Sequence, residues 1–147
     1  MRYTYLLCVL FFATASYAQH PLEGLWQGEL VDSLGTHRFE LLLRLREGKV
    51  SGHSYYYHED RLVTEMEVKG KFHRDHSVSL YDIRLIGGED LLLTGKDPYM
   101  RTYQLLFKRS VFGSSVKGFW QINDGTVGSR LRKVGRIELQ KMKAGKA

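Results

Sequence analysis

The strict alternation of apolar and charged side chains constrains this sequence most. In residues 38–46, Phe39, Leu41, Leu43 and Leu45 alternate with mainly charged residues. Successive side chains of a β-strand point to opposite faces, so this pattern predicts a half-buried strand. Residues 64–72 and 101–108 repeat the pattern, and no window keeps a 3.6-residue apolar period for three turns. The pattern therefore predicts an all-β chain.

Turn signals divide the chain into eight such segments, and all but two of the links between them are short. The longer links are 87–100 and 123–133. Short links place consecutive strands beside each other in antiparallel pairs, and closing an eight-stranded meander into a barrel removes its exposed edges. We therefore predict an eight-stranded antiparallel up-and-down barrel. The predicted strands lie near 25–31, 37–46, 49–58, 62–72, 77–86, 101–109, 116–122 and 134–140.

The first 18 residues are typical of a cleaved signal peptide. Arg2 gives a positive start, residues 5–13 are almost wholly apolar, and small residues stand at Ser16 and Ala18. The apolar run is shorter than the roughly 20 residues that span a bilayer. We expect an exported protein, secreted or periplasmic, with no transmembrane segment after cleavage. Cys8 is the one cysteine and lies in this run, so the exported chain would contain no thiol or disulfide.

The expected domain organisation is a signal peptide over 1–18, one barrel domain over 19–140 and a basic tail over 141–147. The net charge of +6 is concentrated at the C-terminal end, because residues 130–147 contribute +6 and residues 19–129 contribute −1. Such an end suits an envelope protein or an anionic surface, whereas nucleic acid is not an expected partner of an exported chain. The alternative is a solvated tail that aids solubility.

The first predicted strand carries Gly24-Leu25-Trp26, and the third begins "GKVSGHSYYY". These features resemble the lipocalin and avidin-like barrels of the calycin group. The resemblance implies a barrel in which Trp26 plugs one end. It also implies an arginine from the last strand that packs across this indole, for which Arg132 and Arg136 are the candidates. The exported chain has only Trp26 and Trp120, so the resemblance does not extend to the tryptophan-lined biotin pocket of avidins.

The register of the second hairpin decides which tyrosines face the interior. A two-residue turn at Glu47-Gly48 pairs Leu45 with Val50 and points His53, Tyr55 and Tyr57 outward. A three-residue loop over 46–48 would swap the faces, because one residue of slip turns every side chain over. We favour the two-residue turn, which keeps Val50 with the core. The inward set is then Val50, Gly52, Ser54, Tyr56 and His58.

The same register argument, applied to the next hairpin, gives a candidate ligand site. A two-residue turn at Arg74-Asp75 would pair Val68 with Tyr81 and point Tyr81 inward. The candidate lining is amphipathic, as small-molecule sites are, and comprises Tyr56, His58, Tyr81, Arg101, Tyr103 and Trp120. The alternative is that these tyrosines fill the core and bond their hydroxyls at the barrel end.

Other constellations are weaker. His73 and His76 flank a turn with Asp75, but zinc needs three or four ligands, so we predict no metal site. Glu65, Glu67 and Asp82 are expected in an outward charge ladder, with Arg84 opposite Glu65, rather than as catalytic carboxylates.

Three functional hypotheses follow. The first is an exported barrel that binds a small apolar or aromatic, lipid-like or glycan ligand. The second is a non-enzymatic structural or interaction module of the cell envelope with a filled barrel. The third, an enzyme, would need His53 or His58 beside an inward carboxylate, which the pattern does not provide. We expect no enzymatic activity and no cofactor.

Overall fold

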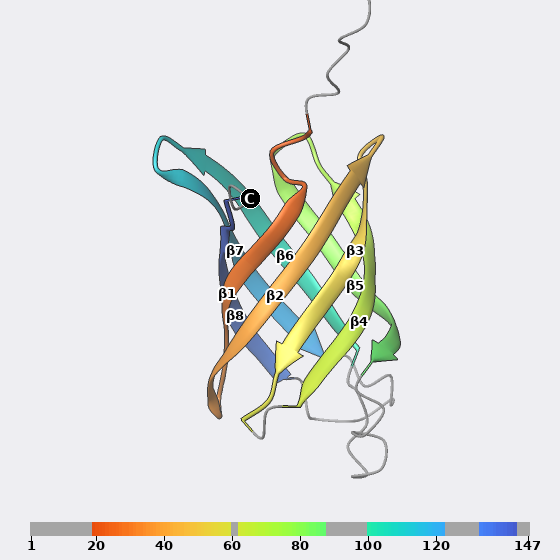
Figure 1. Cartoon of the computed structure of the whole chain (residues 1–147), viewed down its shortest axis with the longest axis vertical. Coiled ribbons are helices and arrows are strands. Elements are labelled where there is room, and N and C mark those ends of the chain that lie inside the picture. Colours follow the sequence, from red (N-terminus) through yellow and green to blue (C-terminus); the bar gives the residue numbers. More distant parts are fainter. Residues whose placement is uncertain (1–18, 60–61, 88–99, 123–132, 144–147) are drawn as a thin grey trace, which may run out of the picture.

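The computed structural model describes residues 19–59, 62–87, 100–122 and 133–143. Eight antiparallel strands form a closed barrel in which each strand pairs with the next and β8 pairs with β1 (Figure 1). The all-β meander barrel predicted from the sequence is confirmed. The strands are β1 Gly24–Asp32, β2 Gly35–Arg46, β3 Lys49–Tyr57, β4 Val63–Phe72, β5 Ser77–Gly87, β6 Arg101–Ser110, β7 Gly113–Ile122 and β8 Lys133–Lys141.

The two ends of the barrel differ. The hairpins β2–β3, β4–β5 and β6–β7 lie at the same end as the start of β1, which we call the Trp26 end. The opposite end, where β3, β5 and β7 finish and β6 begins, we call the Arg101 end. The predicted signal peptide and the tail beyond residue 143 lie outside the described residues. Among the described residues, no helix is long and apolar enough to cross a membrane.

The apolar side chains of the alternating pattern form one core inside the barrel. Phe39, Leu41 and Leu43 of β2 are buried, as are Tyr103 and Leu105 of β6. The charged phase faces outward and pairs between neighbouring strands. Arg84 Nε donates to Glu67 Oε2 at 2.5 Å, His53 Nδ1 lies 2.6 Å from Glu65 Oε1, and Lys117 pairs with Glu138. Alternation in the sequence thus becomes an apolar interior and a charged outer wall.

The β2–β3 hairpin has the predicted two-residue turn. Leu45 pairs with Val50, and Glu47 takes a left-handed conformation with a φ of 50°. Val50, Ser54 and Tyr56 are buried inside the barrel. The other phase of "HSYYY" forms an outer aromatic wall, in which His53 stacks on Tyr55 and the Arg38 guanidinium covers Tyr57.

The β4–β5 hairpin corrects the sequence prediction. Its loop has three residues, because His73 pairs with Ser77 and His76 takes a φ of 66°. Asp75 stabilises this loop by accepting hydrogen bonds from the Ser77 backbone N–H and hydroxyl. The extra residue reverses the faces of β5.

Two residues of β5 therefore lie on the faces opposite to those predicted. Tyr81 points outward and is 50% exposed, whereas Asp82 points inward and is 6% exposed. Register shifts along β4 also place Arg84 opposite Glu67 rather than Glu65. The outward ladder predicted for Glu65, Glu67 and Asp82 thus keeps its two glutamates but loses Asp82.

Trp26 seals one end of the barrel, as the resemblance implied. Its indole is fully buried, its Nε1 donates to the Leu22 carbonyl at 2.8 Å, and its ring meets Phe107 edge to face. The cation that covers it is Lys141, whose Nζ lies 5.9 Å from the ring centroid and donates to the Pro21 carbonyl.

Of the two predicted arginine partners of Trp26, the structure describes only Arg136. Arg136 is exposed on the outer wall, because it occupies the phase opposite to the buried Ile137 and Leu139. The prediction for Arg136 is therefore wrong. Arg132 lies outside the described residues.

We expect any side chain at Gly52 to destabilise the barrel. A Cβ at this position would lie 1.8 Å from the Leu42 carbonyl oxygen, so Gly52→Ala forces β2 and β3 apart. The expected loss in the free energy of unfolding is about 2 kcal/mol, in the range of overpacked cores. Urea unfolding followed by circular dichroism measures it.

Gly87→Ala is the matched control, since among the described residues its new Cβ would meet only the Glu65 side chain, at 3.4 Å. Its expected change is within about 0.5 kcal/mol. Equal losses in the two variants would contradict the close approach of β2 and β3 at Gly52.

Candidate functional site

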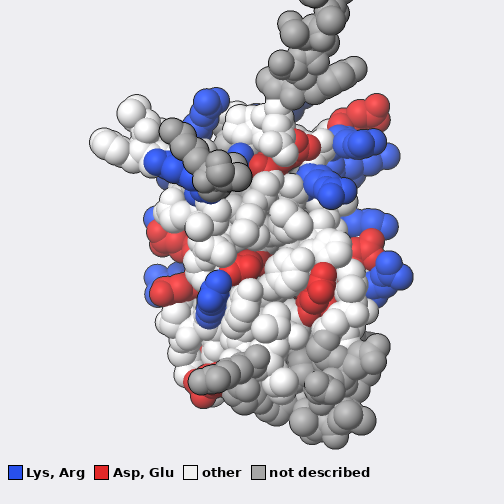
Figure 2. Space-filling model, in the orientation of Figure 1, with Lys and Arg blue, Asp and Glu red and all other residues white. Residues whose placement is uncertain are grey.

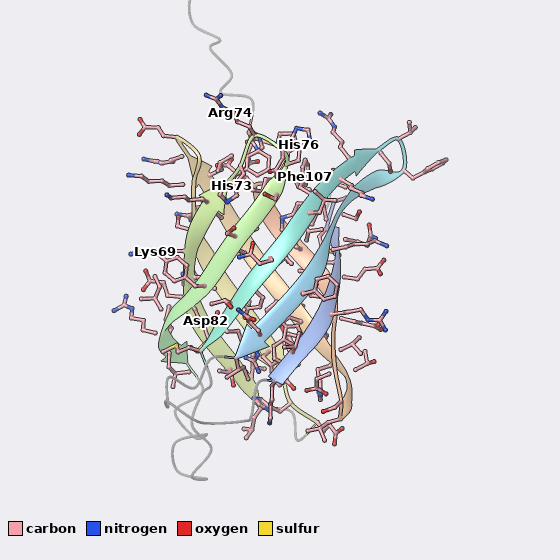
Figure 3. The ribbon with its side chains drawn as sticks, turned by 180° about the vertical axis from the view of Figure 1, so that it is seen from behind. Lys69, His73, Arg74, His76, Asp82 and Phe107 are labelled. Atoms are coloured by element: carbon pink, nitrogen blue, oxygen red, sulfur yellow. The ribbon has the colours of Figure 1, made fainter. Side chains whose placement is uncertain are left out.

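The interior of the barrel toward the Arg101 end holds a cluster of polar side chains. Asp82 of β5 accepts hydrogen bonds from the Tyr103 hydroxyl at 3.2 and 3.3 Å and from the Ser54 hydroxyl at 3.4 Å. The Arg101 backbone N–H donates to Asp82 Oδ2 at 2.9 Å. Figure 3 shows Asp82 on the part of the barrel away from the end that carries Arg74 and His76.

Burial dominates the electrostatics of this cluster. Loss of water around Asp82 raises the pKa of its carboxyl to about 6, although the hydrogen bonds and the Arg101 charge act in the opposite direction. Burial also raises the pKa of the Tyr103 hydroxyl well above its ordinary value, and the neighbouring Asp82 charge adds to this effect. The tyrosine therefore stays protonated and serves as a hydrogen-bond donor to the carboxylate.

The Arg101 side chain crosses the interior above this cluster. Its guanidinium carbon lies 4.6 Å from the centroid of the Tyr56 ring on β3 and 5.5 Å from the centroid of the Trp120 ring on β7. Two aromatic faces thus hold one cation between opposite walls of the barrel. The Arg101 Nε atom is buried and makes no hydrogen bond to any residue that the structure describes.

A ring of aromatic and imidazole groups surrounds Tyr56. The His58 ring meets Tyr56 edge to face at 4.6 Å, and its Nε2 lies 2.8 Å from the Thr64 hydroxyl. The His37 ring lies 5.2 Å from Tyr56 and 3.4 Å from an Asp32 oxygen. Burial raises the pKa of the Tyr56 hydroxyl, against the effect of Arg101.

Trp120 forms one side of this site because β8 leaves room for it. A Cβ at Gly135 would lie 2.5 Å from Trp120 Nε1 and 1.9 Å from the Val31 carbonyl oxygen. The indole N–H instead donates to that carbonyl at 3.3 Å. Glycine at this position therefore allows the indole to approach the backbone of β1 and β8 closely.

The structure brings most of the sequence-predicted residues together. Tyr56 contacts both His58 and Arg101, Trp120 lies on the other side of Arg101, and Tyr103 lies beside Asp82. Tyr81 lies on the outer wall and is not part of the site.

Sequence reasoning missed Asp82 and Ser54 as partners in this site. The predicted register points Ser54 inward without giving it a partner, and the predicted charge ladder points Asp82 outward. The available signal was the phase of β5, in which Asp82 continues the apolar alternation of Val78 and Leu80.

The described residues contain no group of three or more His, Cys, Asp or Glu side chains arranged to hold a metal ion. The site instead offers aromatic faces, one cation with an unused donor and a buried carboxyl group. Such an arrangement suits the binding of a flat molecule that carries an oxygen acceptor.

The closed eight-stranded antiparallel meander is similar in fold to an avidin-like barrel. The chain is similar to a solved structure of a low-affinity mutant of shwanavidin, with a TM-score of 0.51 and 11% sequence identity. The match covers 84% of this chain and 99% of that chain. At this identity the likeness shows the fold alone.

No protein-family model matches the chain, and no curated protein matches it.

The raised pKa of Asp82 predicts a specific pH dependence of stability. The folded carboxyl binds its proton more tightly than the unfolded one, whose pKa is near 3.8, so its contribution is greatest below about pH 4. That contribution, about 3 kcal/mol, is lost as the pH rises through about 6. Asp82→Asn should remove this part of the pH dependence.

Chemical denaturation of both proteins between pH 4 and 8 tests this expectation. The difference in unfolding free energy between wild type and Asp82→Asn isolates the contribution of Asp82, because the other titrating groups are common to both proteins. Parallel profiles would contradict a carboxyl group titrating inside the barrel.

Proposed function

We propose that this protein is an exported, non-enzymatic barrel that binds one small molecule at the Arg101 end. The ligand we infer has an aromatic or apolar body and at least one oxygen acceptor. Among the ligand classes open from the sequence, this favours an aromatic or lipid-like acid over an uncharged glycan fragment.

The observation that carries the proposal is the environment of Arg101. The Arg101 residue is half-buried, but its Nε donor is fully buried, and a buried donor without an acceptor is costly. Here the guanidinium lies between two aromatic rings, and its Nε has no acceptor in the described part of the chain. A ligand oxygen beside Arg101 would supply the missing acceptor, and the ligand body would contact Tyr56 or Trp120. The avidin-like fold is compatible with a ligand bound inside such a barrel.

The contacts of the polar cluster support binding rather than catalysis. Asp82 already accepts hydrogen bonds from Tyr103, Ser54 and the Arg101 backbone, so its oxygens are engaged. The Ser54 hydroxyl donates to this carboxylate directly instead of to a histidine base, which leaves it without the usual activation of a serine nucleophile. Export rests on the signal-peptide pattern of residues 1–18.

The second candidate is an envelope interaction module with a filled barrel. One observation favours it: Arg101 itself crosses the interior and packs against both walls. The two candidates differ in whether a small molecule reaches Arg101, and this difference can be measured.

Native mass spectrometry of the protein purified from its own host without denaturant provides the test. We expect a co-purifying small mass in the wild type and its loss in Arg101→Met, which keeps the aliphatic stem but removes the donors. Losing a charge-assisted hydrogen bond should weaken ligand binding about tenfold to hundredfold. Arg84→Met is the matched control, because Arg84 is exposed and pairs with Glu67 on the outer wall.

Trp fluorescence locates the ligand. Binding should change the emission of a Trp26→Phe variant, which keeps Trp120, and leave the emission of Trp120→Phe unchanged. Two results together would contradict the proposal: no co-purifying mass, and no rise in melting temperature with a panel of small aromatic and lipid-like acids. They would favour the interaction module.

A further inference from the structure

The tip of the β6–β7 hairpin is the most exposed apolar feature among the described residues. Val111 is 98% exposed and Phe112 is 97% exposed. Ser110 pairs with Gly113, so these two residues alone form the turn, and the Ser110 hydroxyl donates to the Gly113 carbonyl at 2.9 Å. Figure 1 shows this hairpin projecting from the Trp26 end.

Turn formation does not explain these two residues. Two-residue hairpin turns favour Asn, Asp and Gly, which accept the required backbone conformations or bond locally. Valine is β-branched and phenylalanine is large and apolar, so neither helps the turn, and full exposure of both is unfavourable in water. The Glu47-Gly48 turn at the same end of the barrel, by contrast, has a charged residue and a glycine, and the glycine suits its positive φ of 75°.

Basic residues lie on the same end of the barrel as the tip. Each of the three hairpins at the Trp26 end carries two basic residues, and none of these forms an ion pair with a residue that the structure describes. They are Arg46 and Lys49 beside the β2–β3 turn, Lys71 and Arg74 beside the β4–β5 turn, and Lys108 and Arg109 beside the β6–β7 turn. Figure 2 shows several Lys and Arg side chains at this end, with acidic side chains between them. The six basic residues outnumber the two exposed carboxylates of these turns, Glu47 and Asp75.

The strand register places several of these positive charges next to one another. Arg46 pairs with Lys49, and Lys49 pairs with Lys71, so three cations stand side by side across β2, β3 and β4. Like charges directly opposite each other destabilise a sheet. An anionic surface would relieve this repulsion, whereas the charged residues lower on the outer wall, such as Arg84 and Lys117, already have carboxylate partners.

A hollow at the base of the hairpin combines the two chemistries. It has a volume of about 550 Å³, and its lining includes Phe72, Phe107, Lys108 and Arg109. Apolar rings next to two cations match the boundary between the acyl chains and the anionic headgroups of a bilayer.

From these observations we propose that the Trp26 end docks on an anionic lipid bilayer, with Val111 and Phe112 inserted among the acyl chains and the hairpin cations against the headgroups. A second copy of the chain fits this end less well, because symmetric pairing would bring two basic rims together. The proposed docking leaves the Arg101 end facing away from the bilayer, so it is independent of the proposed ligand site.

Vesicle flotation tests the proposal, with phosphatidylglycerol-containing and pure phosphatidylcholine vesicles as probes. We expect binding to the anionic vesicles that weakens with added salt, and little binding to the neutral ones. Val111→Ser with Phe112→Ser should weaken binding about tenfold or more, since an exposed phenylalanine would lose its transfer into the bilayer. The removed side chains are almost fully exposed, so the melting temperature should not change.

The matched control replaces Leu34 and Phe119 by serine. Leu34 is 81% exposed at the β1–β2 turn of the opposite end, and Phe119 is 60% exposed on the outer wall. This variant removes a similar apolar area away from the tip and should bind as the wild type does. For charge, Arg109→Glu should weaken binding several-fold more than Arg136→Glu, although both lower the net charge equally.

The variants are compared in the full chain and in a chain that begins at Gln19, because the apolar run of residues 5–13 could itself bind lipid. The shorter chain retains every strand and the closing β1–β8 pairing. In that chain, equal binding by the tip variant and its control would overturn the proposal. Absence of vesicle binding, with a wild-type dimer that the tip variant makes monomeric, would also overturn it and assign the tip to self-association.

Discussion

The pairing of β1 with β8 is the interaction on which the rest of the structure depends. It closes the sheet, so no strand edge among the described residues is left open along the barrel, and it divides all side chains into an inner and an outer set. Once the sheet is closed, the register of each hairpin decides which residues the interior receives. The chemistry of the candidate site therefore follows from turn lengths as much as from residue types.

Both ends of the barrel place a cation against a tryptophan, with different consequences. At one end Lys141 covers Trp26 and donates to the Pro21 carbonyl, so the cation has an acceptor and the end is sealed. At the other end Arg101 lies near Trp120, and its Nε lacks an acceptor in the described part of the chain. The first arrangement is complete in itself, whereas the second would be completed by the ligand oxygen that we propose. This difference is the physical reason for placing ligand binding at the Arg101 end.

The sequence was sufficient to predict the eight strands, because their alternation is regular and most of their links are short. It also predicted the face of Tyr56, since Leu45 and Val50 fix the β2–β3 register. It failed at β5 because His76, which is not a glycine, adopts a left-handed conformation and adds one residue to the loop. A prediction that leaves out this one loop residue places Tyr81 inside the barrel and Asp82 outside. The fold tolerates such an error, but the composition of the site does not.

Two features of this molecule do not contribute to its stability, and they lie at different places. The buried Asp82 carboxyl costs free energy when ionised, and the Val111-Phe112 tip leaves apolar side chains in water that bury nothing on folding. Neither feature is needed to close the barrel, because neither takes part in the β1–β8 pairing or belongs to the apolar core. Features that a fold does not require, and that local rules disfavour, are where function is most often found. Their separation, one inside toward the Arg101 end and one outside at the Trp26 end, means that a ligand and a membrane could be bound without competing for the same surface.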